Sequence, residues 1–144
     1  MAELKTYDAK RINITIGSHI VKGYAEDTFI SIEPDGDGTA AQAGADGEVA
    51  RSLSNNPLHT ITLTLQQTSD TNDFLSDLLK RDRASGGAGV VPLQVVDLRG
   101  TSLFAASQAW VVNWPTIENG SGVGEREWAL QAVATDLHVG GNEA

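Results

Sequence analysis

Cysteine is absent from this chain of 144 residues. Its absence excludes disulfide bonds, a thiolate nucleophile and a zinc site with cysteine ligands, and it is typical of a protein made in a reducing cytosol. Basic residues are also scarce, because 10 Lys and Arg stand against 19 Asp and Glu, giving a formal net charge of -9. Such a chain repels nucleic-acid phosphates and anionic lipid, so tight binding to either is not expected.

Long apolar runs are missing as well. No stretch approaches the roughly 20 apolar residues that span a bilayer, and the polar start at residues 1–6 lacks the apolar centre of a secretion signal. We therefore expect a soluble, unprocessed protein with no membrane partner. A chain of this length is typical of one domain, which buries roughly 70% of its unfolded surface. Without a repeat or a second domain boundary, the sequence predicts a single domain over residues 1–144.

Most of the sequence shows the alternation of apolar and polar residues that is typical of β-strands. Residues 58–65 alternate, with Ile61, Leu63 and Leu65 on one face and threonines on the other. Residues 11–16 alternate in the same way with three isoleucines, and a Gly-Ser turn signal follows. Further strands are predicted at 28–33, 90–98, 101–112 and 125–137. The short connection at 99–100 requires an antiparallel hairpin between the strands on either side of it.

One helix is predicted, over residues 70–83. Ser69 or Asp70 can cap its first turn, Phe74 and three leucines form one apolar stripe, and basic residues gather near its end. Three glycines in 84–89 terminate it. A single helix packed against antiparallel strands predicts a mainly β fold, an antiparallel barrel or sandwich with one α-helix.

The segment at about 34–56 is predicted to project. Pro34 is expected to end the preceding strand, and residues 35–45 are too poor in apolar bulk to bury themselves. We expect a long loop or an irregular hairpin that a partner orders. Its aspartates are spaced somewhat like calcium ligands, but Ala40 replaces the required glycine and Asp46 the closing glutamate. A solvated turn is the favoured interpretation, and no metal or cofactor is expected.

No arrangement of residues predicts catalysis. His19, His59 and His138 lie on separate predicted strands or turns, where we expect them on strand surfaces, without the spacing of a zinc motif. No serine sits in a Gly-x-Ser-x-Gly elbow, and the glycines at 86–89 follow a helix where a phosphate loop would open one. The tryptophans at 110, 114 and 128 could form a sugar platform but are more typical of a core or an interface. The chain is therefore predicted not to be an enzyme.

Short sequence motifs along the chain resemble those of one known family. The clearest runs from Gly44 to Arg51, a glycine-rich stretch that leads through residues 54–56 into the strand at 58–65. Further motifs of this kind occur, in the same order as in the family, at 5–8, 29–33, 63–69, 72–73, 89–93, 97–98, 100–101, 109–110, 126–128 and 139–142. By these motifs the chain resembles the small tail tube proteins of contractile-tailed bacteriophages, nearly from end to end.

The resemblance implies a structural virion protein, made in the cytoplasm of the bacterial host. Subunits of this family close into hexameric rings by edge-to-edge β pairing, and the rings stack into a hollow tube inside a contractile sheath. The implied partners are further copies of the chain, the tail sheath protein, baseplate and tail terminator proteins, and genomic DNA that passes without specific binding. An acidic chain suits such a conduit, because a negative wall repels phosphates. Two alternatives stay open: a tube protein of a related contractile secretion machine, and a free-standing β-sandwich binding module.

Two groups of candidate site residues follow. The segment at 34–56 cannot order itself cheaply and is expected to reach an adjacent subunit or ring. Its candidate interface residues are Asp35, Asp37, Asp46, Glu48, Arg51, Asn55 and Asn56. In the strand at 125–137, burial of Trp128 and Leu130 places the intervening residues on the opposite face. The candidate channel-lining residues on that face are Glu125, Glu127 and Gln131.

Overall fold

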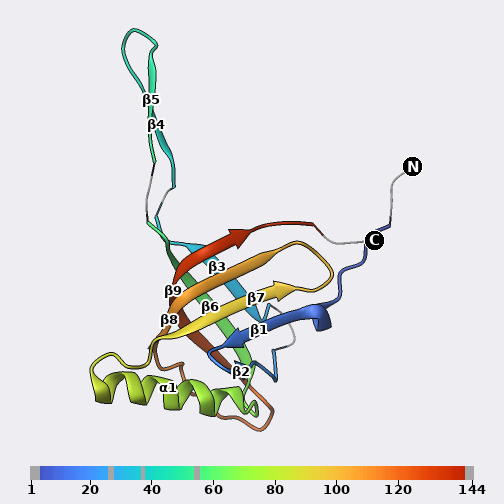
Figure 1. Ribbon diagram of the computed structural model, residues 1–144. Coiled ribbons are helices and arrows are strands. Elements are labelled where there is room, and N and C mark those ends of the chain that lie inside the picture. The colour runs from blue at the N-terminus through green and yellow to red at the C-terminus, as the bar shows by residue number, and fades with distance from the viewer. Residues whose placement is uncertain (1–3, 26–27, 37, 54–55, 142–144) are drawn as a thin grey trace.

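The alternating stretches form one antiparallel sheet of seven strands (Figure 1). The structure is a computed structural model that describes residues 4–25, 28–36, 38–53 and 56–141. The strands of this main sheet are β1 (Ile12–Ile16), β2 (His19–Ile20), β3 (Ile30–Pro34), β6 (Leu58–Gln66), β7 (Val91–Asp97), β8 (Leu103–Asn113) and β9 (Glu125–His138). They lie in the order β2-β1-β7-β8-β9-β6-β3. The predicted mainly β antiparallel fold with one helix is confirmed.

The predicted faces of the strands are confirmed in β6 and β9, which are neighbours. Ile61, Leu63 and Leu65 of β6 are buried, and the threonines between them are half-buried on the other face. In β9 the buried residues Trp128 and Leu130 lie directly opposite Leu63 and Ile61 of β6. Paired residues share a face of a sheet, so both strands turn one apolar row toward a common core.

The helix α1 (Thr71–Ser85) covers one end of that core (Figure 1). The predicted apolar stripe faces the core: Leu75, Leu78 and Leu79 are buried in the core, and Phe74 packs against it. At the first turn the Ser69 hydroxyl oxygen accepts the Thr71 backbone N–H at 3.2 Å, whereas the Asp70 side chain makes no capping bond. The helix is not long and apolar enough to cross a membrane.

A second, two-stranded sheet stands away from the main sheet (Figure 1). It consists of β4 (Ala40–Ala43) and β5 (Val49–Ser52), paired antiparallel. The sequence predicts a long loop or an irregular hairpin for this segment, whereas the observed hairpin pairs in a regular register. A short 3-10 turn, η1 (Ala9–Arg11), precedes β1.

The predicted surface position of His59 was wrong. His59 is buried with 8% of its surface exposed, because it shares the inward row of β6 with Ile61. Its Nδ1 lies 2.9 Å from the Pro57 carbonyl oxygen, and its ring meets Phe104 edge-on at 5.4 Å between centroids. Pro34 ends β3 as predicted, as the last residue of the strand. Proline is tolerated there because β3 is an edge strand, where a missing N–H breaks no ladder.

Candidate functional site

The projecting hairpin comprises residues 38–53, and all of them are exposed. Its tip is a short turn in which Gly44 N–H donates to the Glu48 carbonyl at 2.8 Å and Glu48 N–H donates to Asp46 Oδ1 at 3.1 Å. Within the part of the chain that the structure describes, β4 and β5 pair only with each other. An isolated two-stranded hairpin is only marginally stable in water.

The base of the hairpin is fixed to the main sheet. Asp35 Oδ1 accepts the Thr60 hydroxyl at 2.7 Å, Asp35 N–H donates to the Leu58 carbonyl at 3.0 Å, and the Asn56 side-chain amide donates to the Asp35 carbonyl at 3.1 Å. Just beyond this anchor, Gly36 and Gly38 have positive φ angles of 95° and 71°. Most residues avoid this region of backbone space, so the two glycines redirect the chain away from β3.

The candidate interface residues are therefore spread along the hairpin and do not form one site. Asp35 and Asn56 anchor its base, Arg51 lies on β5, and Asp46 and Glu48 form the tip. The remaining two candidates, Asp37 and Asn55, lie outside the described residues.

The calcium interpretation also loses its geometric basis. Asp35 and Asp46 lie at opposite ends of β4, whereas calcium requires its oxygen ligands around one point. Across the described ranges of the chain, no three histidine or carboxylate side chains gather where they could hold a metal ion.

The channel-lining candidates lie on the outer face of the main sheet, the face turned away from the core. Glu125, Glu127 and Gln131 pair with Gln66, Thr64 and Thr60 of β6. The same face includes Glu33 of β3, opposite Thr60, and Asp136 of β9, opposite Ala105. It is therefore a polar surface whose charged strand residues are carboxylates.

Basic residues are nearly missing from these strands. Across the seven strands of the main sheet, Arg126 alone is basic, and it belongs to the inward row of Trp128. Its guanidinium donates to the Glu118 carbonyl at 3.2 Å and to the Asn119 side-chain oxygen at 3.1 Å, in the connection before β9. No lysine or arginine of the main strands thus projects from the outer face.

A third surface, which we call the apolar slot, opens between β1 and β3. In the sheet order β3 is one end strand and β1 is next to the other end strand, β2. The two are not neighbours in the sheet, although both line one cavity of about 590 Å³. The apolar residues that line it include Ile12, Ile32, Val95, Phe104 and Leu137. A second hollow of about 620 Å³ adjoins it and shares Tyr7, Ile12 and Val95. The sequence carries no signal for this slot, because it depends on how far the sheet curls.

Nearer the helix, the chain closes the gap between the two ends of the sheet. Val21 N–H donates to the Ile14 carbonyl at 3.0 Å, and Ala25 N–H donates to the Thr64 carbonyl at 3.1 Å. Between them lies Tyr24, where burial raises the pKa of the phenol and a hydrogen bond to the Ile14 backbone opposes that rise. The slot is thus the part of the core margin that this crossing segment leaves open.

A smaller groove lies at the helix end, where the connection between β8 and β9 passes α1. Trp114 and Ile117 are 46% and 71% exposed, and the groove between them, Asn72 and Trp128 has a volume of about 170 Å³. Trp128 itself is buried and donates from Nε1 to Asn72 Oδ1 at 2.9 Å. Trp110 lies apart on the outer face, opposite Gln131, so the three tryptophans form no common platform.

The histidines do not converge either. His19 stacks on Phe74 with 4.5 Å between ring centroids, and its Nε2 lies 2.9 Å from the Thr71 hydroxyl. His138 is exposed at the end of β9. Together with the buried His59, they occupy three separate places in the fold.

Comparison with known proteins gives two relationships by sequence. The family model described as Bacteriophage PhiTE tail tube protein matches residues 5–140. A curated relative, "Structural protein ORF10" of Pseudomonas phage KPP10, is 29% identical over 145 residues, which cover 96% of this chain and 84% of the relative.

Two solved structures share the fold. One is the sheath/tube terminator of an extracellular contractile injection system, PVC, with a TM-score of 0.60 at 14% identity, over 91% of this chain and 95% of that chain. The other is the tube-terminating cap of the anti-feeding prophage, with a TM-score of 0.56 at 12% identity, over 92% and 90%. At these identities the likeness establishes the fold alone. Because the family model spans most of the sequence, the chain belongs to the Bacteriophage PhiTE tail tube protein family, a family of phage structural proteins.

Proposed function

We propose that the protein is the subunit of the inner tube of a contractile phage tail. Copies close into hexameric rings, rings stack into a hollow tube, and the tube guides DNA during ejection into the host. The whole chain acts as one tube domain in the virion, with the sheath, baseplate and tail terminator proteins as its other partners. The observation that carries the proposal, beside the family, is the fully exposed hairpin. Its exposed surface is available for contact with another subunit.

The edges of the main sheet support ring formation. β3 ends the sheet on one side, and the two-residue β2 covers only part of β1 on the other. Free strand edges invite pairing with another chain, and a closed ring removes them. Each copy thus offers two different free edges, with which strands of neighbouring copies can pair in a head-to-tail ring.

The outer face supports the assignment of the channel wall. A conduit for DNA must not bind phosphates, and this face carries carboxylates and neutral polar groups without lysine or arginine on its strands. Repulsion between such a wall and the DNA keeps the polymer in motion. We therefore assign Glu125, Glu127 and Gln131 to the lumen of the tube.

Negative-stain electron microscopy of the purified protein tests the proposal. At rising protein concentration we expect rings and then tubes, because subunit association follows mass action. A protein that stays monomeric in light scattering over a wide range of concentration and salt would contradict the tube function. Single rings that never stack would favour a tube-terminating role, which is how the two solved relatives of similar fold are described.

A tube protein of a contractile secretion machine is the second candidate. The fold likeness to proteins of an extracellular contractile injection system and of the anti-feeding prophage favours it. Both candidates predict the same tube, and they differ in whether DNA passes through it. Tubes inside DNA-filled particles from an infected culture would decide for the phage tail.

The lumen assignment predicts a charge effect at Glu127. We expect Glu127→Lys to preserve tube assembly and to slow DNA ejection by roughly tenfold at low salt, because a ring of positive charge attracts phosphates. The delay should vanish as salt rises. Asp77→Lys is the matched control, since it makes the same charge change at an exposed position on α1. Equal ejection rates of both variants and wild type at low salt would place Glu127 outside the lumen.

A further inference from the structure

The hairpin carries one row of large side chains along β5. Val49 and Leu53 are 66% and 64% exposed, and Arg51 lies between them at the alternate position. Their neighbours across the ladder are small, because Val49 pairs with Ala43 and Arg51 with Ala41. The row therefore projects from a thin ribbon, as two apolar side chains with a cation between them.

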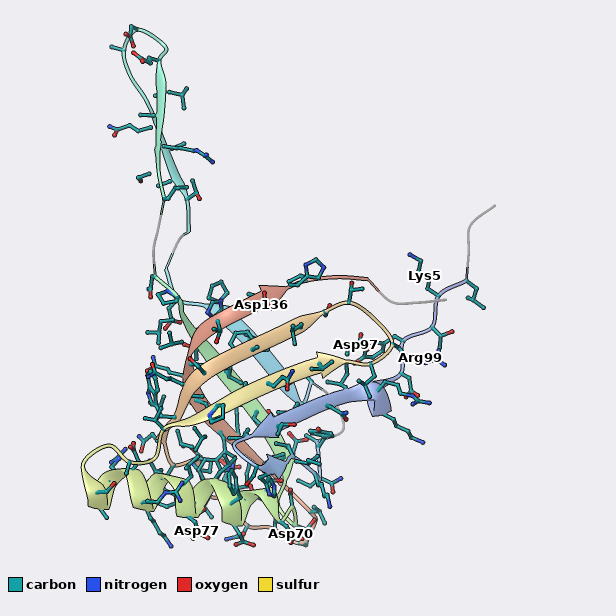
Figure 2. The ribbon with its side chains drawn as sticks, viewed as in Figure 1. Lys5, Asp70, Asp77, Asp97, Arg99 and Asp136 are labelled. Atoms are coloured by element: carbon teal, nitrogen blue, oxygen red, sulfur yellow. The ribbon has the colours of Figure 1, made fainter. Side chains whose placement is uncertain are left out.

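The apolar slot offers the complementary features. Its lining includes Ile12 and Ile32, which pack against the core but are only partly buried. Beside them, β3 presents a free strand edge. The slot also contains Asp97, which is 8% exposed and accepts the Arg99 backbone N–H at 2.9 Å. Within the described residues, no lysine or arginine forms an ion pair with Asp97. Figure 2 places Asp97 at the β7–β8 turn, on the side of the sheet away from α1.

We propose that β5 of one copy docks in the apolar slot of a neighbouring copy. It adds a strand along the free edge of β3, places Val49 and Leu53 against the slot's apolar lining, and brings Arg51 to Asp97. Strand addition of this kind gains affinity from main-chain hydrogen bonds and specificity from alternate side chains. The proposal rests on the tube function, because a tube subunit meets mostly copies of itself.

The dimensions and charges favour a second copy as the occupant. Figure 1 shows the hairpin standing well away from the main sheet of its own chain, which allows it to reach another subunit. Arg51 is the one cation in residues 38–53, and Asp97 is the one carboxylate that lines the slot. Because donor and acceptor surfaces differ, each copy can give one hairpin and receive another, and the contact propagates.

Thiol cross-linking tests the contact directly. The chain has no cysteine, so an introduced pair supplies its only thiols. In the double variant Val49→Cys/Leu137→Cys, a short bismaleimide should join hairpin to slot and yield covalent oligomers larger than dimers. Each single variant can give dimers at most. The control pair Val49→Cys/Ile117→Cys replaces the slot position by one beside the helix-end groove and should give no ladder.

The outcomes separate this contact from the tube function. Tubes in electron micrographs without a ladder from the slot pair, or with a ladder from the control pair instead, overturn the slot contact and leave the tube function intact. A ladder from the slot pair without tubes supports the contact and overturns the tube function. Absence of both tubes and ladder counts against both.

A charge variant tests the pairing of Arg51 with Asp97. Arg51→Glu should raise the protein concentration at which assembly begins by about tenfold, because it brings two carboxylates together. Lys80→Glu makes the same change in net charge at an exposed position on α1 and should leave that concentration unchanged. Equal behaviour of the two variants would overturn the charge pairing.

Discussion

Replacing residues 38–53 by two glycines should abolish tube assembly and leave the subunit folded. Every residue removed is exposed, and the anchors of the hairpin's base, Asp35 and Asn56, are kept. The core therefore loses no buried area, and we expect the midpoint of thermal unfolding to stay within a few degrees of wild type. Assembly should fail because the subunit loses its projecting contact element. Circular dichroism during heating, together with negative-stain microscopy, measures both effects.

Two finer variants show whether the apolar row is responsible. Val49→Ser/Leu53→Ser keeps the length of the hairpin and removes the row, so we expect the same loss of tubes. Ala50→Ser changes the opposite face of β5, which pairs with Gln42, and should assemble normally. Normal tubes from the glycine replacement would exclude a role of the hairpin in assembly. An unfolded subunit would show instead that the hairpin stabilises the core.

Trp128→Ala should destabilise the subunit by about 3–5 kcal/mol, the usual cost of removing a large aromatic side chain from a core. Trp128 is 2% exposed, lies opposite Leu63, and donates its indole N–H to Asn72 at the start of α1. Its loss leaves a cavity and removes the hydrogen bond that joins β9 to the helix. Since domains are stable by about 5–15 kcal/mol, much of the stability would disappear. The midpoint and slope of urea unfolding measure the change.

Two controls separate packing from hydrogen bonding at this position. Asn72→Ala keeps the ring and removes its acceptor, which should cost about 1–3 kcal/mol for the unpaired indole N–H. Trp110→Ala removes a ring of the same size from the half-buried outer face and should cost less than Trp128→Ala. Equal losses for the two tryptophan variants would contradict the assignment of Trp128 to the core.

The predictable parts of this fold are those with a strict sequence period. β6 and β9 alternate over their buried lengths, and α1 repeats leucine at helical spacing, so each face follows from chain geometry. The burial of His59 follows from its place in the alternating row of β6, whereas histidine as a residue type indicates a surface position. The strands of the hairpin could not be predicted, because its alanines and glycines show no alternation of apolar and polar residues.

The candidate site also has one part that the sequence predicts and one part that it does not. The outer position of Glu127 follows from the burial of Trp128 one residue later, which alternation alone predicts. The apolar slot could not be predicted, because Ile12 and Ile32 look like ordinary core residues in the sequence. Their partial exposure arises from sheet curvature, which depends on contacts between strands far apart in the chain.

The two glycines at the base of the hairpin bear on the mechanics of the assembled tail. Gly36 and Gly38 have positive φ angles, and glycine changes its backbone angles more easily than other residues, so each can act as a joint between the main sheet and the hairpin. In a stack joined through such elements, we expect a tilt between successive rings to be taken up by rotation at these joints. The contacts themselves then stay in register while the shaft bends. We expect a tail built this way to bend along its length while the wall of its channel stays unbroken.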